Sequence, residues 1–554
     1  MIRRPRRAWG FACGWITAFV AVPGCATQSP LPAGANVRAP ISPPQLPPPS
    51  PIAELPAPPT PEAKPTATLR PGSAPNSPLA LREVLESVEA AFPLLYAIEQ
   101  ERQIASGQRL AAEGQFDPVV RARGMDQSGS FSNGQFDTVV EQAMPFGGVS
   151  TFAGWRLGMG NFPVYYGERK TGEGGEFRTG VNVPLLQNRE IDPRRARLRA
   201  AQIAEQLADP TVRRARLDYF RAASQAYWNW QAAGAQYRVV QDLLRLARER
   251  QALLDERRKQ GLVGEAVPVL NQRLIAGREE ALLAADRLLQ QAAVRLSLYT
   301  RDSAGNPVVP PAEWLLPGFA ELAPPSPDAA QLQSDVTAAL SRRPELVRFQ
   351  LEKERRAVEL KLATNQLSPA LNTYAQVAQD TGAGKKTFTG TGSFAFDRTT
   401  AEVGAMFEMP LPFRNARGLT NTARAQLAQL LAQERFARDE IAAQVQDAVS
   451  ELVQMHRRVD KAREELKYAV RVLQLETESF KARQISLVEL NLQEIAAAEA
   501  RAKVVGVLGS YFGAVANYFA VLGFAGPTVG GAVLPRADPE PSIPMMPPPR
   551  EPNP

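Results

Sequence analysis

Two hydrophobic patterns recur along the middle of the chain and predict different elements. Apolar residues alternate with polar ones over 153–159, 177–183 and 403–409, which is typical of strands with one apolar face. From Val445 to Leu473 the apolar residues are instead spaced three and four apart, which predicts a helix with a coiled-coil seam of about four heptads. The seam residues are Val445, Ala448, Leu452, Met455, Val459, Ala462, Leu466, Ala469 and Leu473.

These patterns belong to a unit that occurs twice. Residues 92–95 match residues 343–346 at an offset of 251, and residues 183–186 match 409–412 at an offset of 226. Because the offset falls by 25, the first β segment is longer by that many residues. Such self-similarity indicates a duplicated unit and must be considered before single elements. We place the repeats at 79–301 and 330–524, joined by a Pro-rich connector at 302–329.

Each repeat is expected to contain a long helical hairpin. A helix start is marked at Asp192-Pro193, and the polar, Ala-rich stretch to about Gln260 predicts a helix of roughly 100 Å. Pro210 should kink or interrupt it. The chain reverses near 260–264 in the first repeat and near 483–486 in the second. The returning helices are predicted at 267–299 and 487–522.

The β segments fit two kinds of sheet. An apolar face opposite a polar one suits a membrane barrel strand, and it equally suits a half-buried strand in a soluble sheet. The first segment has room for four strands and the second for two, so neither closes a barrel within one chain; in lipid, copies of the chain would have to share one. Aromatic residues expected near strand ends and loops are Phe131, Phe136, Phe146, Phe162, Tyr165, Tyr166, Phe388, Phe394 and Phe413.

The N-terminal region predicts export and anchoring. Residues 1–24 combine four arginines with an apolar run, as in a secretory signal peptide, and removing these arginines lowers the formal net charge from +7 to +3. Residues 22–25 resemble a lipoprotein box with Cys25 as the lipidated residue, the alternative being ordinary cleavage after Ala26. Proline is enriched in 25–78, a predicted lipid-anchored linker, and in 525–554, a predicted disordered tail.

Little in the chain suggests covalent chemistry. His456 is the only histidine and neighbours the seam residue Met455, while Cys13 lies inside the predicted signal, so neither a zinc cluster nor a His-dependent nucleophile is expected. The run 382–387 departs from a phosphate-loop pattern and is interpreted as a loop between strands. We expect no enzyme, no cofactor, no metal site and no nucleic-acid partner.

The order of these features resembles the TolC-like outer membrane efflux family over about residues 79–524. The resemblance is carried by Pro184 and Pro410 where strands lead into long helices, and by the sequences at 226–228, 261–263, 485–487 and 516–519. It implies a homotrimeric β-barrel in the outer membrane, continued by an α-helical barrel into the periplasm, with the connector as an equatorial belt. Such proteins are passive exit ducts in tripartite efflux or type I secretion systems, supplied by an inner-membrane pump through a periplasmic adaptor.

The resemblance also assigns roles at the two reversals. The adaptor-contacting residues are predicted to be Gly261, Leu262, Val263, Gly264, Gln484, Ile485 and Ser486. Glu489 and Arg483 are gate candidates, although Leu492 stands where a second acid is common in the family. The longer first β segment departs from the usual two strands, so either the barrel is larger or the extra hairpin lies outside it.

We therefore expect an α+β membrane protein in which a duplicated unit of long coiled-coil hairpins and transmembrane strands forms a trimeric α-barrel/β-barrel channel. The alternative is a periplasmic coiled-coil structural lipoprotein tethered to the outer membrane, with its β segments in a small soluble sheet.

Overall fold

The computed structural model describes residues 77–163, 165, 170–382 and 395–524. Several predicted features lie outside these residues: the signal peptide, Cys25, nearly all of the first Pro-rich segment, the C-terminal tail and most of the run 382–387. Tyr166, Phe388 and Phe394 lie outside them as well.

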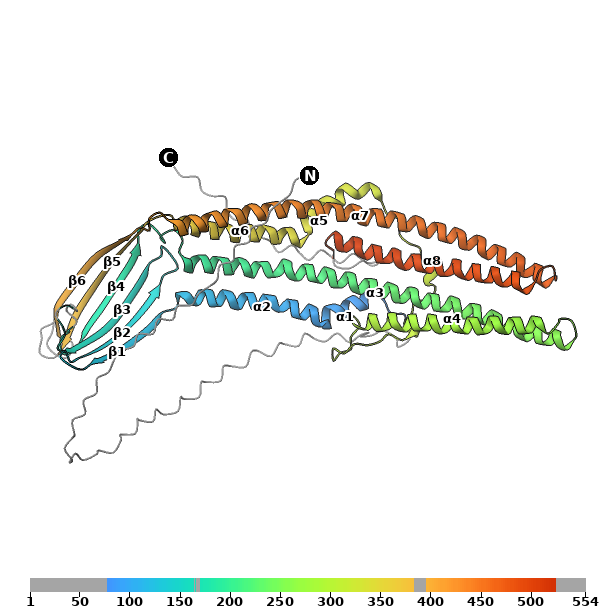
Figure 1. The fold of residues 1–554 in the computed structure, drawn as a ribbon, viewed down its shortest axis with the longest axis horizontal. Coiled ribbons are helices and arrows are strands. Elements are labelled where there is room, and N and C mark those ends of the chain that lie inside the picture. The colour runs from blue at the N-terminus through green and yellow to red at the C-terminus, as the bar shows by residue number, and fades with distance from the viewer. Residues whose placement is uncertain (1–76, 164, 166–169, 383–394, 525–554) are drawn as a thin grey trace, which may run out of the picture. The chain divides into compact units, whose positions relative to one another are not determined.

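The order of elements is similar in the two predicted repeats (Figure 1). The first repeat contains α1 (Leu81–Ala91), α2 (Pro93–Glu113), the turn η1 (Gly114–Phe116), four strands, α3 (Pro193–Lys259) and α4 (Ala266–Ser297). The second contains α5 (Leu332–Arg342), α6 (Pro344–Asn365), two strands, α7 (Arg414–Lys481) and α8 (Leu487–Val521). Between them lie the short turns η3 (Ala312–Trp314), η4 (Phe319–Glu321) and η5 (Ala329–Gln331).

The long helix α3 begins where the sequence predicts. The Asp192 side chain accepts hydrogen bonds from the backbone nitrogens of Arg194 at 2.8 Å and Arg195 at 3.0 Å, which caps the first turn. Of the two expected effects of Pro210, a kink or an interruption, the interruption is wrong, because α3 runs through Pro210 as one helix of 67 residues. Proline removes one hydrogen bond, and the packing of α3 against α2, α4, α6 and α8 outweighs that loss.

The coiled-coil seam on α7 is confirmed, since none of its nine residues is exposed. It packs against α8. Among the described residues, α8 is the one helix long and apolar enough to cross a membrane, with a mean hydropathy of 1.5 over 18 residues. However, 67% of that window is buried inside the protein, and α8 packs against both α3 and α7. Its apolarity is thus that of a core helix.

The hydrophobic core lies midway along the helices, where the connector packs against them. Trp228 of α3 stacks on Phe512 of α8 with ring centroids 4.3 Å apart, and Phe319 of η4 packs beside both. The backbone nitrogen of Leu316 donates to Gln231 Oε1 at 2.9 Å. The connector therefore joins the two repeats and also completes the core.

The strands form one antiparallel sheet in the order β1-β2-β3-β4-β5-β6. Their bounds are Val119–Gln127, Asn133–Ala143, Ser150–Gly160, Glu176–Pro184, Ala370–Gly382 and Ala395–Glu408. Among the described residues the first repeat has four strands and the second has two, as expected. The sheet lies at one end of the long helices, and both reversals lie at the other (Figure 1).

Candidate channel wall and hairpin tips

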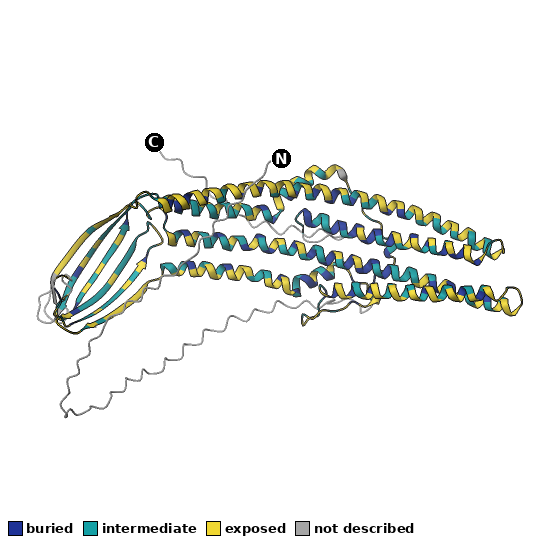
Figure 2. Cartoon of the chain, in the orientation of Figure 1, coloured by how far each residue is buried: buried dark blue, intermediate teal, exposed yellow. Residues whose placement is uncertain are grey.

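The two faces of the sheet differ in polarity. Strand register places Trp155 beside Phe177 and Phe136 beside Leu157, and these belong to one face, here called the apolar face. Its larger apolar members include Val120, Phe136, Val140, Trp155, Leu157, Phe177, Val181, Val377, Val403 and Phe407. Val403 is 82% exposed and Val120 67%. In Figure 2 the strands are mostly teal and yellow, while dark-blue residues gather along the helices.

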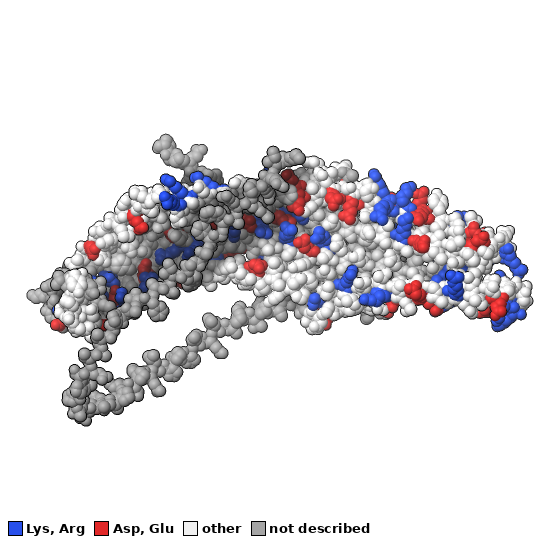
Figure 3. Space-filling model, in the orientation of Figure 1, with Lys and Arg blue, Asp and Glu red and all other residues white. Residues whose placement is uncertain are grey.

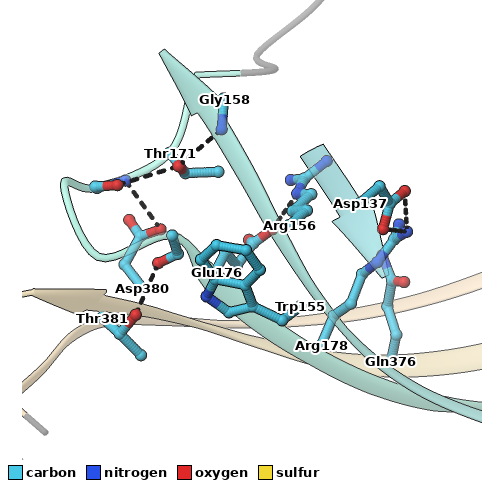
Figure 4. Close-up of polar contacts among 12 residues, drawn as sticks. Asp137, Trp155, Arg156, Gly158, Thr171, Glu176, Arg178, Gln376, Asp380 and Thr381 are labelled. Carbon is cyan, nitrogen blue, oxygen red and sulfur yellow. Dashed lines mark hydrogen bonds and ion pairs between the residues drawn. The ribbon is translucent and has the colours of Figure 1, made fainter. Parts of the chain in front are cut away.

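The opposite face, here called the polar face, carries paired charges. Arg178 of β4 donates to both carboxylate oxygens of Asp137 on β2, at 2.7 and 2.8 Å. Arg156 of β3 pairs with Glu176 of β4 (Figure 4). Arg121, Gln376 and Glu402 lie on the same face; Arg121 pairs with Glu141, and Gln376 donates to Glu402 at 2.5 Å. This arrangement suits water on the polar face and hydrocarbon on the apolar one.

Aromatic residues occur at both ends of the sheet. Phe146, in the turn between β2 and β3, and Phe413, just after β6, lie at the end nearest the helices. Phe131 and Tyr165 lie at the far end with ring centroids 6.3 Å apart. Phe136 differs from the expectation, since it lies within β2 rather than near an end. The two levels match the interfacial positions of a membrane barrel.

The first reversal is closed by a Schellman motif. After α3 ends at Lys259, the backbone nitrogen of Leu262 donates to the Arg257 carbonyl at 2.8 Å, and that of Gly261 donates to the Arg258 carbonyl at 2.9 Å. Gly261 has φ +72°, the left-handed conformation that this motif requires and that glycine adopts without strain.

The second reversal has the same backbone geometry with a different residue at its centre. Gln484 donates to the Ser479 carbonyl at 2.9 Å and Arg483 to the Phe480 carbonyl at 3.1 Å. Here Arg483 takes the left-handed conformation, with φ +61°. An arginine in this conformation is strained, and strained residues gather at functional sites.

The structure places the predicted tip residues together at the end of the helices opposite the sheet. Val263 and Ile485 are half-buried, and the remaining members Gly261, Leu262, Gly264, Gln484 and Ser486 are exposed. Charged atoms also gather at this end in the view of Figure 3. The last turn of α3 is basic, with Arg257, Arg258 and Lys259.

The gate candidate Glu489 has a structural partner at the start of α8. Its Oε2 accepts from the Ser486 backbone nitrogen at 2.7 Å and from the Ser486 hydroxyl at 2.9 Å, and the Ser486 hydroxyl accepts from the Glu489 nitrogen at 3.3 Å. These bonds form a capping box. They hold the pKa of Glu489 below its usual value. The carboxylate therefore fixes the first turn of the returning helix.

A buried polar cluster between the two hairpins was missed at the sequence level. Glu494 of α8 pairs with Arg250 of α3 and, at 2.7 Å, with Arg278 of α4; all three side chains are at most 10% exposed. Arg278 also donates to Asn491 Oδ1 and to the Leu243 carbonyl, each at 2.7 Å. Burial, together with the nearby Arg250 charge, lowers the pKa of Arg278 to about 10. The available signal was weak: an amide and a carboxylate, Asn491 and Glu494, three residues apart and therefore on one face of the helix.

No group of three or more His, Cys, Asp or Glu side chains suited to a metal ion occurs among the described residues. His456 lies on α7 with its Nδ1 3.3 Å from Asp460 and its ring against Tyr511. Its surroundings are those of a residue flanking the seam.

Residues 336–523 match the sequence model of the family described as outer membrane efflux protein. No curated protein matches the chain. The outer membrane channel CmeC of Campylobacter jejuni is similar in structure, with a TM-score of 0.56 at 15% identity over 80% of this chain and 85% of that one. VceC of Vibrio cholerae gives 0.55 at 14% identity, covering 80% of this chain and 96% of that one.

The open state of the MtrE outer membrane channel of Neisseria gonorrhoeae gives a TM-score of 0.55 at 13% identity, over 80% of this chain and 88% of that one. At such low identity these likenesses show the fold, which agrees with the sheet and the long hairpins described above. The match to the family model falls within the second repeat. Over residues 336–523 the chain thus resembles the outer membrane efflux protein family, and its fold is that of solved outer membrane channels.

Proposed function

We propose that this protein is the outer-membrane exit duct of a tripartite efflux or type I secretion system. It conducts substrate passively from an inner-membrane pump and a periplasmic adaptor to the exterior. Three copies form the duct: their sheets join into one barrel across the membrane, and their helices continue it into the periplasm. The duct works by opening and closing, without covalent chemistry.

The observation that carries this proposal is the sheet itself. Its apolar face is exposed, its polar face carries ion pairs, and both edge strands, β1 and β6, lack a second neighbour within the described chain. In hydrocarbon every backbone polar group needs a partner, so an open sheet is stable there only if other copies close it. The chain also supplies a 67-residue and a 68-residue helix, each about 100 Å long at 1.5 Å per residue.

The rival, a periplasmic coiled-coil lipoprotein, is less well supported because its sheet would be soluble. A soluble sheet buries its apolar face against a second layer. Here the described helices continue from one end of the sheet and do not cover either face (Figure 1). Phe407 is accordingly 61% exposed, and Phe177 55%.

The hairpin tips are the proposed adaptor contact. Five of their seven residues are exposed, they lie at the end farthest from the sheet, and each is formed by a short, defined turn. Gly261 to Gly264 and Gln484 to Ser486 would meet the adaptor, and opening would splay the hairpins. Arg483 and Glu489 remain gate candidates.

Fractionation tests the proposal directly. The protein should be found in detergent-extracted outer membrane as a heat-modifiable trimer, and the purified trimer should conduct ions across a planar bilayer. Release by lipase or by alkaline carbonate alone would support the tethered periplasmic lipoprotein and contradict the duct. A proline at Ile485 should abolish export while the trimer persists; unchanged export would contradict the assignment of the tips.

A further inference from the structure

The first repeat carries two more strands than the second, and this asymmetry has a consequence for the exit. We propose that β2 and β3 are built into the membrane wall, so that each copy supplies six strands and the barrel passes bulky, water-soluble solutes. The inference rests on the proposed function, because copies of the chain must close the barrel. A symmetric duplication would supply four strands per copy. Barrel diameter grows about linearly with strand number, so the exit is roughly 1.5 times wider whatever the number of copies.

Strand register places the β2-β3 hairpin inside the wall. β1 pairs with β2 from Val119↔Glu141 to Gln127↔Asn133, along its whole length. β3 pairs with β4 from Ser150↔Asn182 to Arg156↔Glu176. A hairpin lying outside the wall would leave β1 and β4 paired with each other. The apolar face also continues across the hairpin, through Val140 and Trp155.

Ion pairs on the polar face link the β2-β3 hairpin to β1 on one side and to β4 on the other. The β1-β2 seam carries Arg121 and Glu141, and the β3-β4 seam carries Arg156 and Glu176. Arg178 reaches from β4 across β3 to Asp137 on β2. Register places Gly154 opposite Arg178. Glycine has no side chain to separate the guanidinium from the carboxylate, and Figure 4 shows Arg178 in contact with Asp137.

The turn between β2 and β3 packs closely against the segment that follows β4. Gly148 has φ +69°, and a Cβ atom there would lie 2.3 Å from the Asn188 carbonyl oxygen and 2.8 Å from Pro184 Cγ. The turn thus packs directly on the segment that leads from β4 into α3. At the far end, the buried Asn133 amide donates to Gln127 Oε1 at 3.3 Å and to the Asn161 carbonyl at 3.3 Å. Both ends of the hairpin are therefore fixed in place.

The partner that completes the wall is a second copy of this chain, with its β6 beside β1. Both edges are long, at 9 and 14 residues, and neither is blocked by a described element. Three copies would give eighteen strands from six each, and barrels of about 16–18 strands leave an aqueous channel. The charges on the polar face would line that channel in pairs, without a strong preference for one sign of solute.

Native fluorescence tests whether the hairpin contacts lipid. Trp155 is the only tryptophan in the described strands, and it lies on the apolar face. Reconstitution into brominated phospholipid should quench part of the emission, and Trp155→Phe should remove that quenchable part. Trp228→Phe, which changes a buried tryptophan of the helical core, is the matched control and should retain it. A native trimer whose emission is not quenched by brominated lipid would overturn the inference.

A shortened variant tests the width. Joining Gln127 to Glu176 through Asn-Gly deletes both inserted strands; both flanking residues lie on the polar face, so a two-residue hairpin keeps the alternation of β1 and β4 in register. The largest polymer that enters the pore from the outer side should fall in radius by roughly one third. If the shortened variant conducts and admits polymers of the same radius as the native protein, the inference of a wider exit is wrong but the proposed function stands. If the native protein neither trimerises nor conducts, the proposed function itself is wrong.

Discussion

Replacing Glu494 by glutamine should loosen the contact between the two helical hairpins. The change keeps the size of the side chain and removes the charge that faces Arg250 and Arg278. The side chains of Glu494, Arg250 and Arg278 are only 6%, 10% and 7% exposed, so water cannot replace the lost partner easily. Breaking a buried ion pair from one side costs about 3–5 kcal/mol, and because glutamine retains one acceptor we expect the lower value, about 3 kcal/mol.

Amide hydrogen exchange measures this change locally. Opening of α8 around residues 490–500 should become easier, and exchange there roughly 100-fold faster, since each 1.4 kcal/mol is a factor of ten. Glu465→Gln is the matched control, because Glu465 pairs with Lys503 at 2.6 Å between α7 and α8 with both side chains at least 50% exposed. An exposed pair contributes about 0–1 kcal/mol, so this variant should change exchange about five-fold at most.

The reasoning is refuted if Glu494→Gln has no larger effect than Glu465→Gln. A triple variant, Glu494→Leu with Arg250→Met and Arg278→Met, checks the cause. Apolar replacement of a whole buried ionic group is often neutral or stabilising. Protection of α8 should therefore return in the triple variant, which would show that the cost in Glu494→Gln comes from the charges left without a partner.

Three further predictions concern the tips and the sheet. Arg483→Gly should relieve the left-handed strain and slow exchange of the Gln484 amide roughly five-fold, whereas Gly261→Ala should speed exchange of the Leu262 amide. The hydrogen bonds from Ser486 lower the pKa of Glu489, so this carboxylate stabilises the start of α8 fully above its usual pKa near 4.5 and loses that effect as the pH falls through the lowered pKa. Amide exchange at the start of α8 should therefore rise in that pH range, and Glu489→Gln should abolish the pH dependence. Gly148→Ala should destabilise the turn between β2 and β3 by about 1–3 kcal/mol, which would lower the dissociation temperature of the proposed oligomer. Gly147→Ala, where the nearest neighbour is a side-chain atom at 3.4 Å, should have the smaller effect.

Periodicity predicted most of the fold because the long elements obey it over many residues. The seam from Val445 to Leu473 and the alternation around Phe177 each repeat a simple spacing, and both are present in the structure. Pro210 does not interrupt α3, because the local preference of proline competes with packing along a 67-residue helix. The ion pairs between α8 and the first hairpin could not be predicted from the sequence, because Glu494 and Arg250 are 244 residues apart and no pattern in the chain links them.

The two helical hairpins are stabilised by different kinds of contact, and this difference determines which of them can move more easily. The first is held internally by buried polar contacts: Asn271 of α4 donates to the Ala247 carbonyl and to Gln251 Oε1 of α3, each at 2.9 Å. The second is joined along an apolar seam, with its charged contact exposed to solvent. α8 nevertheless contacts both helices of the first hairpin through Glu494, so it cannot swing away without leaving two buried guanidinium groups unpaired. In the proposed duct, resistance to opening would thus reside on α8. The same repeat carries the strained Arg483 and the capping Glu489, which makes it the better candidate for the proposed gate.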